Sequence, residues 1–290
     1  MRNSIALLQV CVILSAIGVF NHVNGWQQTG SGRKAQGRAQ GRAQGRGRAA
    51  EKGEGRSPDE DGKAGAEPPK HDYHFVVTIE KWERKWIPVG LGTIYNPWTV
   101  FTTAKLYNTI KDLIDKRNVR IGAGSHNLKV FENTRQYRQP CSGGVHPNYN
   151  GQINNLGILH LSEAFRFNKY VSNIQIPKMD ASISGSCRFG GWGDTNFGTI
   201  SQKFPSMVTG CSPSDKSIIC TSSATCQGDE GAPLVCTQNN RMFAYGIAID
   251  VTGACGSGNS NFFATTKLDR AWLNTTIDAG RTKCRTYYKF

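Results

Sequence analysis

The cysteines are the residues of this chain whose number and spacing first indicate a chemistry. Eight of the nine lie after residue 140: Cys141, Cys187, Cys211, Cys220, Cys226, Cys236, Cys255 and Cys284. An even set predicts up to four disulfide bonds in an oxidising compartment. The spacing does not favour zinc, because no Cys-x-x-Cys pair occurs and the six histidines do not cluster with carboxylates. We therefore expect no metal site and no cofactor.

The N-terminal segment indicates that the chain enters an oxidising compartment. An apolar run from Ile5 to Phe20 follows Arg2 and precedes a small residue, Gly25, which is typical of a secretory signal peptide over residues 1–25. The alternative is an uncleaved membrane anchor, but the run is shorter than the roughly 20 residues that a bilayer requires. The sequence thus predicts a secreted protein whose mature chain has no transmembrane segment.

Residues 26–71 have the composition of a disordered arm and linker. Residues 26–50 repeat a short Arg-Ala-Gln-Gly unit and contain six basic and no acidic side chains, whereas residues 51–71 contain four basic and six acidic ones. Spaced cations attract polyanions by counterion release, so acidic glycans or an anionic cell surface are candidate partners of residues 26–50. Secretion argues against nucleic acid. A solvated spacer or a removed propeptide remains the alternative.

From residue 72 to residue 290 the composition is that of a folded domain. Short apolar segments such as 74–79, 119–122, 156–161 and 245–249 are separated by Gly, Pro and Asn, which predicts β-strands joined by turns. Helical periodicity is found near the end, over Leu268–Ala279, with Gly280 as a stop signal. We predict an all-β domain of two small barrels with a C-terminal helix.

Several motifs of this domain resemble those of trypsin-like serine proteases. The segment Thr225–Cys236 reads TCQGDEGAPLVC and is similar to the family's nucleophile segment, CQGDSGGPLVC. Val100–Lys105 resembles the segment that ends in the catalytic histidine, and His146–Tyr149 together with Asn154–Leu161 resembles the segment that holds the catalytic aspartate. Gly190–Gly193 matches a Gly-Gly-Trp-Gly turn. The resemblance implies two packed antiparallel six-stranded β-barrels with a C-terminal α-helix.

The resemblance aligns three altered residues with the catalytic triad. Lys105 stands at the general base, Asn155 at the orienting aspartate and Glu230 at the nucleophilic serine. The triad chemistry requires an attacking hydroxyl, a base with a free lone pair near neutral pH and a buried carboxylate. A carboxylate is a weak nucleophile toward an amide, and a lysine with a pKa of about 10.4 has no free lone pair at pH 7. A one-residue shift at Asn155 would substitute Leu156, which also lacks a carboxylate.

We expect Lys105 and Glu230 to form an ion pair in this cleft, with Asn155 hydrogen-bonding nearby. A new hydrolytic activity of such a pair is the alternative, but the carboxylate would hold the lysine protonated. The positions of the specificity pocket are Ala224, Val251 and Asn261, which leave no anionic anchor and narrow the slot.

The resemblance also concerns the loop around residue 229. Gly228 is the glycine that the family has in its oxyanion-hole loop. In active relatives, cleavage creates a new amino terminus that pairs with the aspartate at this position, and the chain has no segment that resembles the cleaved one. Asp229 therefore either finds another donor or belongs to a mobile loop.

The resemblance implies disulfide bonds as well. It pairs Cys187 with Cys236, Cys211 with Cys220 and Cys226 with Cys255, and it leaves Cys141 with Cys284. An intermolecular bond from Cys141 or Cys284 is the alternative. Asn274-Thr275-Thr276 is the only glycosylation sequon of the chain.

Together these features predict a secreted, non-catalytic serine protease homologue. Homologues of this kind, frequent in insects, operate in immune cascades, clotting and reproductive fluids. By analogy, the chain would bind extracellular proteins, active serine proteases among them, as a cofactor, regulator or decoy. A polyanion- or glycan-binding protein and a residual hydrolase are the alternatives.

Overall fold

The computed structural model describes residues 65–183, 185–193, 196–209, 215–222, 225–250, 261–267 and 270–286. The expected signal peptide and the basic arm up to residue 64 lie outside these residues. The packed part of the chain includes residues 65–71, which composition assigned to the linker. Ala66 forms an antiparallel bridge with Gln202, and the His126 Nε2 atom lies 2.8 Å from the Glu67 Oε1 atom.

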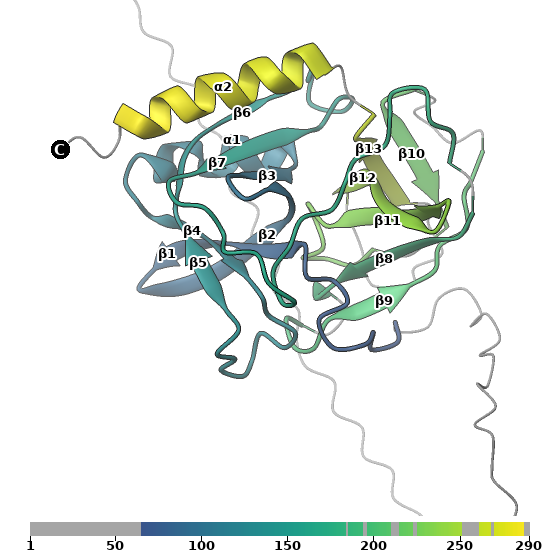
Figure 1. The fold of residues 1–290 in the computed structure, drawn as a ribbon, viewed down its shortest axis with the longest axis horizontal. Helices are drawn as coiled ribbons and strands as arrows, with labels where there is room; N and C mark the ends of the chain where they lie inside the picture. The colour runs from purple at the N-terminus through teal and green to yellow at the C-terminus, as the bar shows by residue number, and fades with distance from the viewer. Residues whose placement is uncertain are drawn as a thin grey trace, which may run out of the picture. The chain divides into compact units, whose positions relative to one another are not determined.

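The first half of the domain forms a seven-stranded antiparallel sheet in the order β5-β4-β1-β2-β3-β7-β6 (Figure 1). Its strands are β1 (Val76–Glu83), β2 (Lys85–Asn96), β3 (Thr99–Thr102), β4 (Val119–Ala123), β5 (Gln136–Arg138), β6 (Pro140–Val145) and β7 (Gly157–Leu161). β-Branched and aromatic residues make these strands, and their apolar side chains fill the curled interior. Lys105, which follows β3, and Asn155, which precedes β7, lie in the segments that adjoin this sheet.

The second half forms a six-stranded antiparallel sheet in the order β10-β13-β12-β11-β8-β9. Its strands are β8 (Cys187–Gly191), β9 (Ser201–Lys203), β10 (Ile218–Thr221), β11 (Pro233–Gln238), β12 (Arg241–Asp250) and β13 (Asn261–Thr265). The segment that contains Glu230 leads directly into β11. The all-β class is therefore confirmed, whereas the first sheet has seven described strands and not six because the three-residue β5 pairs with β4.

Two helices complete the described domain, and the sequence predicted only one of them. α1 (Ala104–Ile114) begins at Thr103, whose side chain caps the helix, and buries Leu106, Ile110 and Ile114 at intervals of four residues. This spacing places the three side chains on one face of the helix, which explains why α1 forms. The sequence did not predict α1, because the protease motif Val100–Lys105 ends as the helix begins and gives no information on it.

The C-terminal helix α2 (Arg270–Thr286) is longer than predicted. The expected stop at Gly280 is wrong, because the helix continues through it. Gly280 is buried against His160: a Cβ atom there would lie 1.9 Å from the His160 Cδ2 atom. The glycine allows α2 to approach β7 closely, at a cost of about 1 kcal/mol in helix propensity relative to alanine. Figure 1 shows α2 running across the seven-stranded sheet beside β6 and β7.

The domain has a core in each sheet and a third cluster that links them. Trp192, Tyr245 and Phe263 belong to the core of the second sheet, and Ile79 and Ile121 belong to that of the first. The third cluster joins β3, β7, β12 and α2, and consists of Phe101, Leu156, Ile158, Ile176, Ile247, Leu273 and Ile277. The candidate site lies where the sheets adjoin this cluster.

Candidate functional site

The backbone around Glu230 is fixed between the two sheets. The Leu91 N–H in β2 donates to the Glu230 carbonyl at 2.7 Å, and the Gly231 N–H donates to the Ala248 carbonyl in β12 at 2.9 Å. Gly231 has a φ of +95°, and a Cβ atom there would lie 1.9 Å from the Leu91 carbonyl oxygen. A glycine is therefore required after Glu230, and the Glu230 side chain is held at a constant place between the sheets.

Asp229 is buried and accepts hydrogen bonds from the backbone. Its Oδ1 atom accepts from the Gly193 N–H at 2.8 Å, and its Oδ2 atom accepts from the Cys226 N–H at 2.9 Å. A Cβ atom at Gly191 would lie 2.1 Å from the Asp229 Oδ1 atom. Of the two alternatives left open by the sequence, the structure has the one in which Asp229 finds other donors. The glycines of the Gly-Gly-Trp-Gly turn make room for its carboxylate.

The Glu230 carboxylate contacts the start of α1. Its Oε1 atom accepts a hydrogen bond of 2.6 Å from the Thr103 hydroxyl, which itself accepts from the Leu106 N–H at 2.9 Å. An anion is favoured at this end of a helix because the first N–H groups carry partial positive charge. Thr103 is fully buried. Glu230 is therefore joined to α1 through one hydroxyl group.

The other two aligned residues meet through the backbone of α1. The Lys105 N–H donates to the Asn155 Oδ1 atom at 3.0 Å, and Asn155 is 4% exposed. The Lys105 side chain is exposed, since its neighbours Ala104 and Leu106 are the buried residues of this turn. Among the ion pairs of the described residues, none joins Lys105 to Glu230. The expected ion pair is therefore wrong, because the missed helix directs the ammonium toward solvent.

Comparisons with known proteins give the same family as the motifs. The trypsin family model matches residues 64–273. The chain belongs to the trypsin family. It is 25% identical to Trypsin-1 of Salmo salar over 64% of this chain and 80% of that protein, and 26% identical to Trypsin of Sus scrofa over 54% and 74%. Azurocidin of Homo sapiens is 29% identical over 53% of this chain and 65% of that protein.

The structure of this trypsin-family chain contains two of the disulfide bonds that the resemblance implies. Cys141 is bonded to Cys284, with Cα atoms 5.3 Å apart, and Cys187 is bonded to Cys236, with Cα atoms 4.0 Å apart. The first bond fastens α2 to β6, and the second joins β8 to β11.

Other predicted site residues are only partly covered by the structure. Cys220 and Cys226 are also disulfide-bonded, but their expected partners Cys211 and Cys255 lie outside the described residues. Two residues of the expected specificity pocket, Ala224 and Val251, lie outside them as well. The third, Asn261, begins β13, and the structure describes its backbone only.

The remaining predictions concern glycosylation, metal binding and a membrane-spanning segment. Asn274 is exposed on α2, and its glycosylation stays a prediction. In the part of the chain that the structure describes, no group of three metal-ligating side chains could hold an ion. No described helix is long and apolar enough to cross a membrane.

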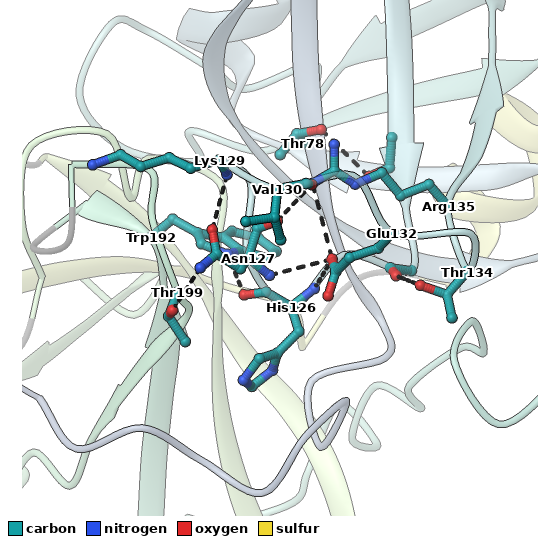
Figure 2. Close-up of polar contacts among 12 residues, drawn as sticks. Thr78, His126, Asn127, Lys129, Val130, Glu132, Thr134, Arg135, Trp192 and Thr199 are labelled. Carbon is teal, nitrogen blue, oxygen red and sulfur yellow. Dashed lines mark hydrogen bonds and ion pairs between the residues drawn. The ribbon is translucent and has the colours of Figure 1, made fainter.

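A hydrogen-bonded loop between β4 and β5 was missed by the sequence analysis. Figure 2 shows the Glu132 carboxylate beside the backbone of His126 and Asn127, whose N–H groups donate to its Oε2 atom at 2.7 and 3.2 Å. From the other side, the Arg135 guanidinium donates to the Asn127 and Val130 carbonyl oxygens at 2.6 and 2.7 Å. The Arg135 guanidinium thus binds two backbone oxygens and lies 3.9 Å from the Glu132 carboxylate.

The same loop, residues 126–135, connects the two sheets. The Leu128 N–H donates to the Gly198 carbonyl, and the Trp192 Nε1–H donates to the His126 carbonyl at 3.1 Å. At its tip the Phe131 side chain is 91% exposed. No motif indicated this network, because it depends on backbone groups that any sequence has.

Proposed function

We propose that this trypsin-family chain is a secreted protein that binds other proteins and does not hydrolyse peptide bonds. The observation that carries the proposal is the pair of contacts made by Glu230 and Lys105: the carboxylate accepts from Thr103, and the ammonium faces solvent. A serine-protease mechanism needs a hydroxyl nucleophile and an adjacent base that accepts its proton. The aligned positions supply an acceptor-only carboxylate and an exposed ammonium.

The surroundings of the three residues support the same proposal. The Asn155 side chain accepts from the Lys105 backbone N–H, so its oxygen is used in holding the first turn of α1. The Thr103 hydroxyl is buried as the helix cap and already donates to Glu230. The amide and the hydroxyl of this site are thus engaged in hydrogen bonds that hold α1, and the Thr103 hydroxyl is buried away from any substrate.

The biological role that we propose is that of a cofactor, regulator or decoy for active serine proteases in an extracellular fluid of an immune or reproductive pathway. A chain with the shape of a protease and no turnover can occupy a protease's partners, and relatives of the matched family include proteins named trypsin. The disulfide bonds support secretion, since such bonds persist in oxidising compartments.

The test of this proposal compares the purified wild-type protein with Glu230→Ala in a peptide-library assay and with a fluorophosphonate probe that labels nucleophilic serines. We expect no turnover and no labelling in either protein, with a trypsin sample as the positive control. Turnover by the wild-type protein that is lost in Glu230→Ala would establish a residual hydrolase instead. Both proteins must unfold in a cooperative thermal transition, so that inactivity is not a result of misfolding.

A polyanion-binding function is the second candidate, and the charge of the chain favours it. The chain has a formal net charge of +14, and residues 26–50 contain six basic and no acidic side chains. Retention on a heparin column that disappears when residues 26–50 are deleted would favour this function. Stable cross-linking to one extracellular protein at high salt, unaffected by that deletion, would favour protein binding.

A further inference from the structure

A cavity of about 420 Å³ lies between α2, the end of β7 and the turn before β3. The Trp98 indole, the Leu161 side chain and Cys284 line its walls, together with the buried His160. A volume of this size is in the range of small-molecule sites in proteins, and apolar walls with few polar groups are typical of them. None of the residues that line the cavity is one of the three aligned positions Lys105, Asn155 and Glu230.

The walls of this cavity are held in place by covalent and close contacts. Cys284 is bonded to Cys141 in β6, so the last turns of α2 cannot move away from the sheet. Gly280 lies against the His160 ring, where a Cβ atom would be 1.9 Å from the His160 Cδ2 atom. The cavity is therefore formed before any ligand arrives, which lowers the entropic cost of binding.

Two arginines give the cavity a positive charge. Arg281 and Arg285 line it, and because they are four residues apart they lie on the same face of α2. Like charges at this spacing destabilise a helix by a few tenths of a kcal/mol. Within the described residues, no carboxylate forms an ion pair with either guanidinium, and no acidic residue lines the cavity.

His160 does not add to this charge at neutral pH. Burial lowers the pKa of its imidazole to about 4, so the ring is neutral at pH 7. Its ring nitrogens are buried and make no hydrogen bond of normal geometry, so the ring serves as a wall. The charge that a ligand would meet comes from the two exposed arginines.

We propose that this cavity binds a small organic anion, in which a carboxylate or a similar anionic group is attached to a flat apolar body. The anionic group would pair with Arg281 and Arg285, whose guanidinium groups suit planar oxyanions. The apolar body would pack on the Trp98 indole and Leu161. The helix dipole also favours cations near the C-terminal end of a helix. Lys283 in the same turn provides a control for that effect.

The test uses the full chain and two matched probes, 2-naphthoate and its neutral analogue 2-naphthylmethanol, in isothermal titration calorimetry. We expect 2-naphthoate to bind with a Kd below about 1 mM and the neutral analogue to bind at least about ten-fold more weakly. Arg281→Gln and Arg285→Gln should each weaken 2-naphthoate by roughly ten-fold, as loss of a charge-assisted hydrogen bond predicts. Lys283→Gln should change it less than about two-fold.

Trp98→Ala should weaken both probes, because both present the same aromatic body to the cavity. The proposal is overturned if the two probes bind equally, if Lys283→Gln has the effect of Arg281→Gln, or if no heat of binding is seen at about 5 mM 2-naphthoate. Thermal unfolding of each variant identifies any that does not fold, and the two arginine variants are independent of one another in this respect.

Discussion

At the scale of single residues, the Thr103 side chain joins Glu230 to the start of α1 in the candidate site. Its hydroxyl caps α1 and donates to Glu230, so Thr103→Val removes both contacts at once. We expect a loss of about 2 kcal/mol in the free energy of unfolding, measured by urea denaturation. Thr109→Val, on the exposed side of the same helix, should cost less than about 0.5 kcal/mol. Lys105→Ala should also be nearly neutral, and a loss as large as that of Thr103→Val would restore the ion-pair hypothesis.

His160 predicts a pH dependence of stability at the same scale. Burial lowers its pKa from 6.5 to about 4, partly offset by the nearby Thr276 backbone. The unfolded chain therefore binds the proton first as the pH falls, so the stabilisation is complete above about pH 6.5 and is lost toward pH 4. Between pH 7 and pH 4.5 we expect the wild-type protein to lose up to about 3 kcal/mol more than His160→Leu does. Parallel pH profiles of the two proteins would contradict this assignment.

The sequence located the three aligned positions but not their contacts. Lys105, Asn155 and Glu230 lie in one region, as the motifs predicted, and Lys105 and Asn155 are joined by a hydrogen bond. That bond uses the Lys105 backbone, however, and the side chain is exposed. Motif comparison gives a residue's position along the chain. The direction of its side chain depends on the local helix, and here that helix has eleven residues.

At the scale of elements, apolar spacing predicted the strands, whereas α1 was missed although its own spacing indicates a helix, and the end of α2 was misplaced because tertiary contacts determine it. The strands were expected from short apolar runs between turn residues, and the structure has them. The predicted end of α2 was wrong. Gly280 indicates a helix stop when the sequence is considered alone, but the residues that contact it in space allow the helix to continue. The contact with His160 and the bond from Cys284 hold the helix together beyond that residue. Neither contact can be deduced from the helix sequence alone.

The loop of residues 126–135 carries a prediction at this scale. Arg135→Met keeps the length of the side chain but leaves the Asn127 and Val130 carbonyl oxygens without their donor. We expect a loss of about 2 kcal/mol, with faster amide hydrogen exchange in residues 126–135, because the Glu132 carboxylate also loses its nearest cation. Lys129→Met, on the exposed part of the loop, is the matched control and should leave exchange unchanged. Equal exchange in both variants would show that Arg135 does not organise the loop.

At the scale of the whole molecule, the third apolar cluster should make the two sheets unfold together. Leu273 of α2 is fully buried in the cluster that contains residues of β3, β7 and β12. Leu273→Ala should therefore cost about 2–4 kcal/mol and lower the midpoint of one cooperative transition, followed by calorimetry. Thr275→Ala, exposed on the same helix, should cost less than about 0.5 kcal/mol. Two separate transitions in Leu273→Ala, with one unchanged from the wild-type protein, would show that each sheet is stabilised by its own core alone.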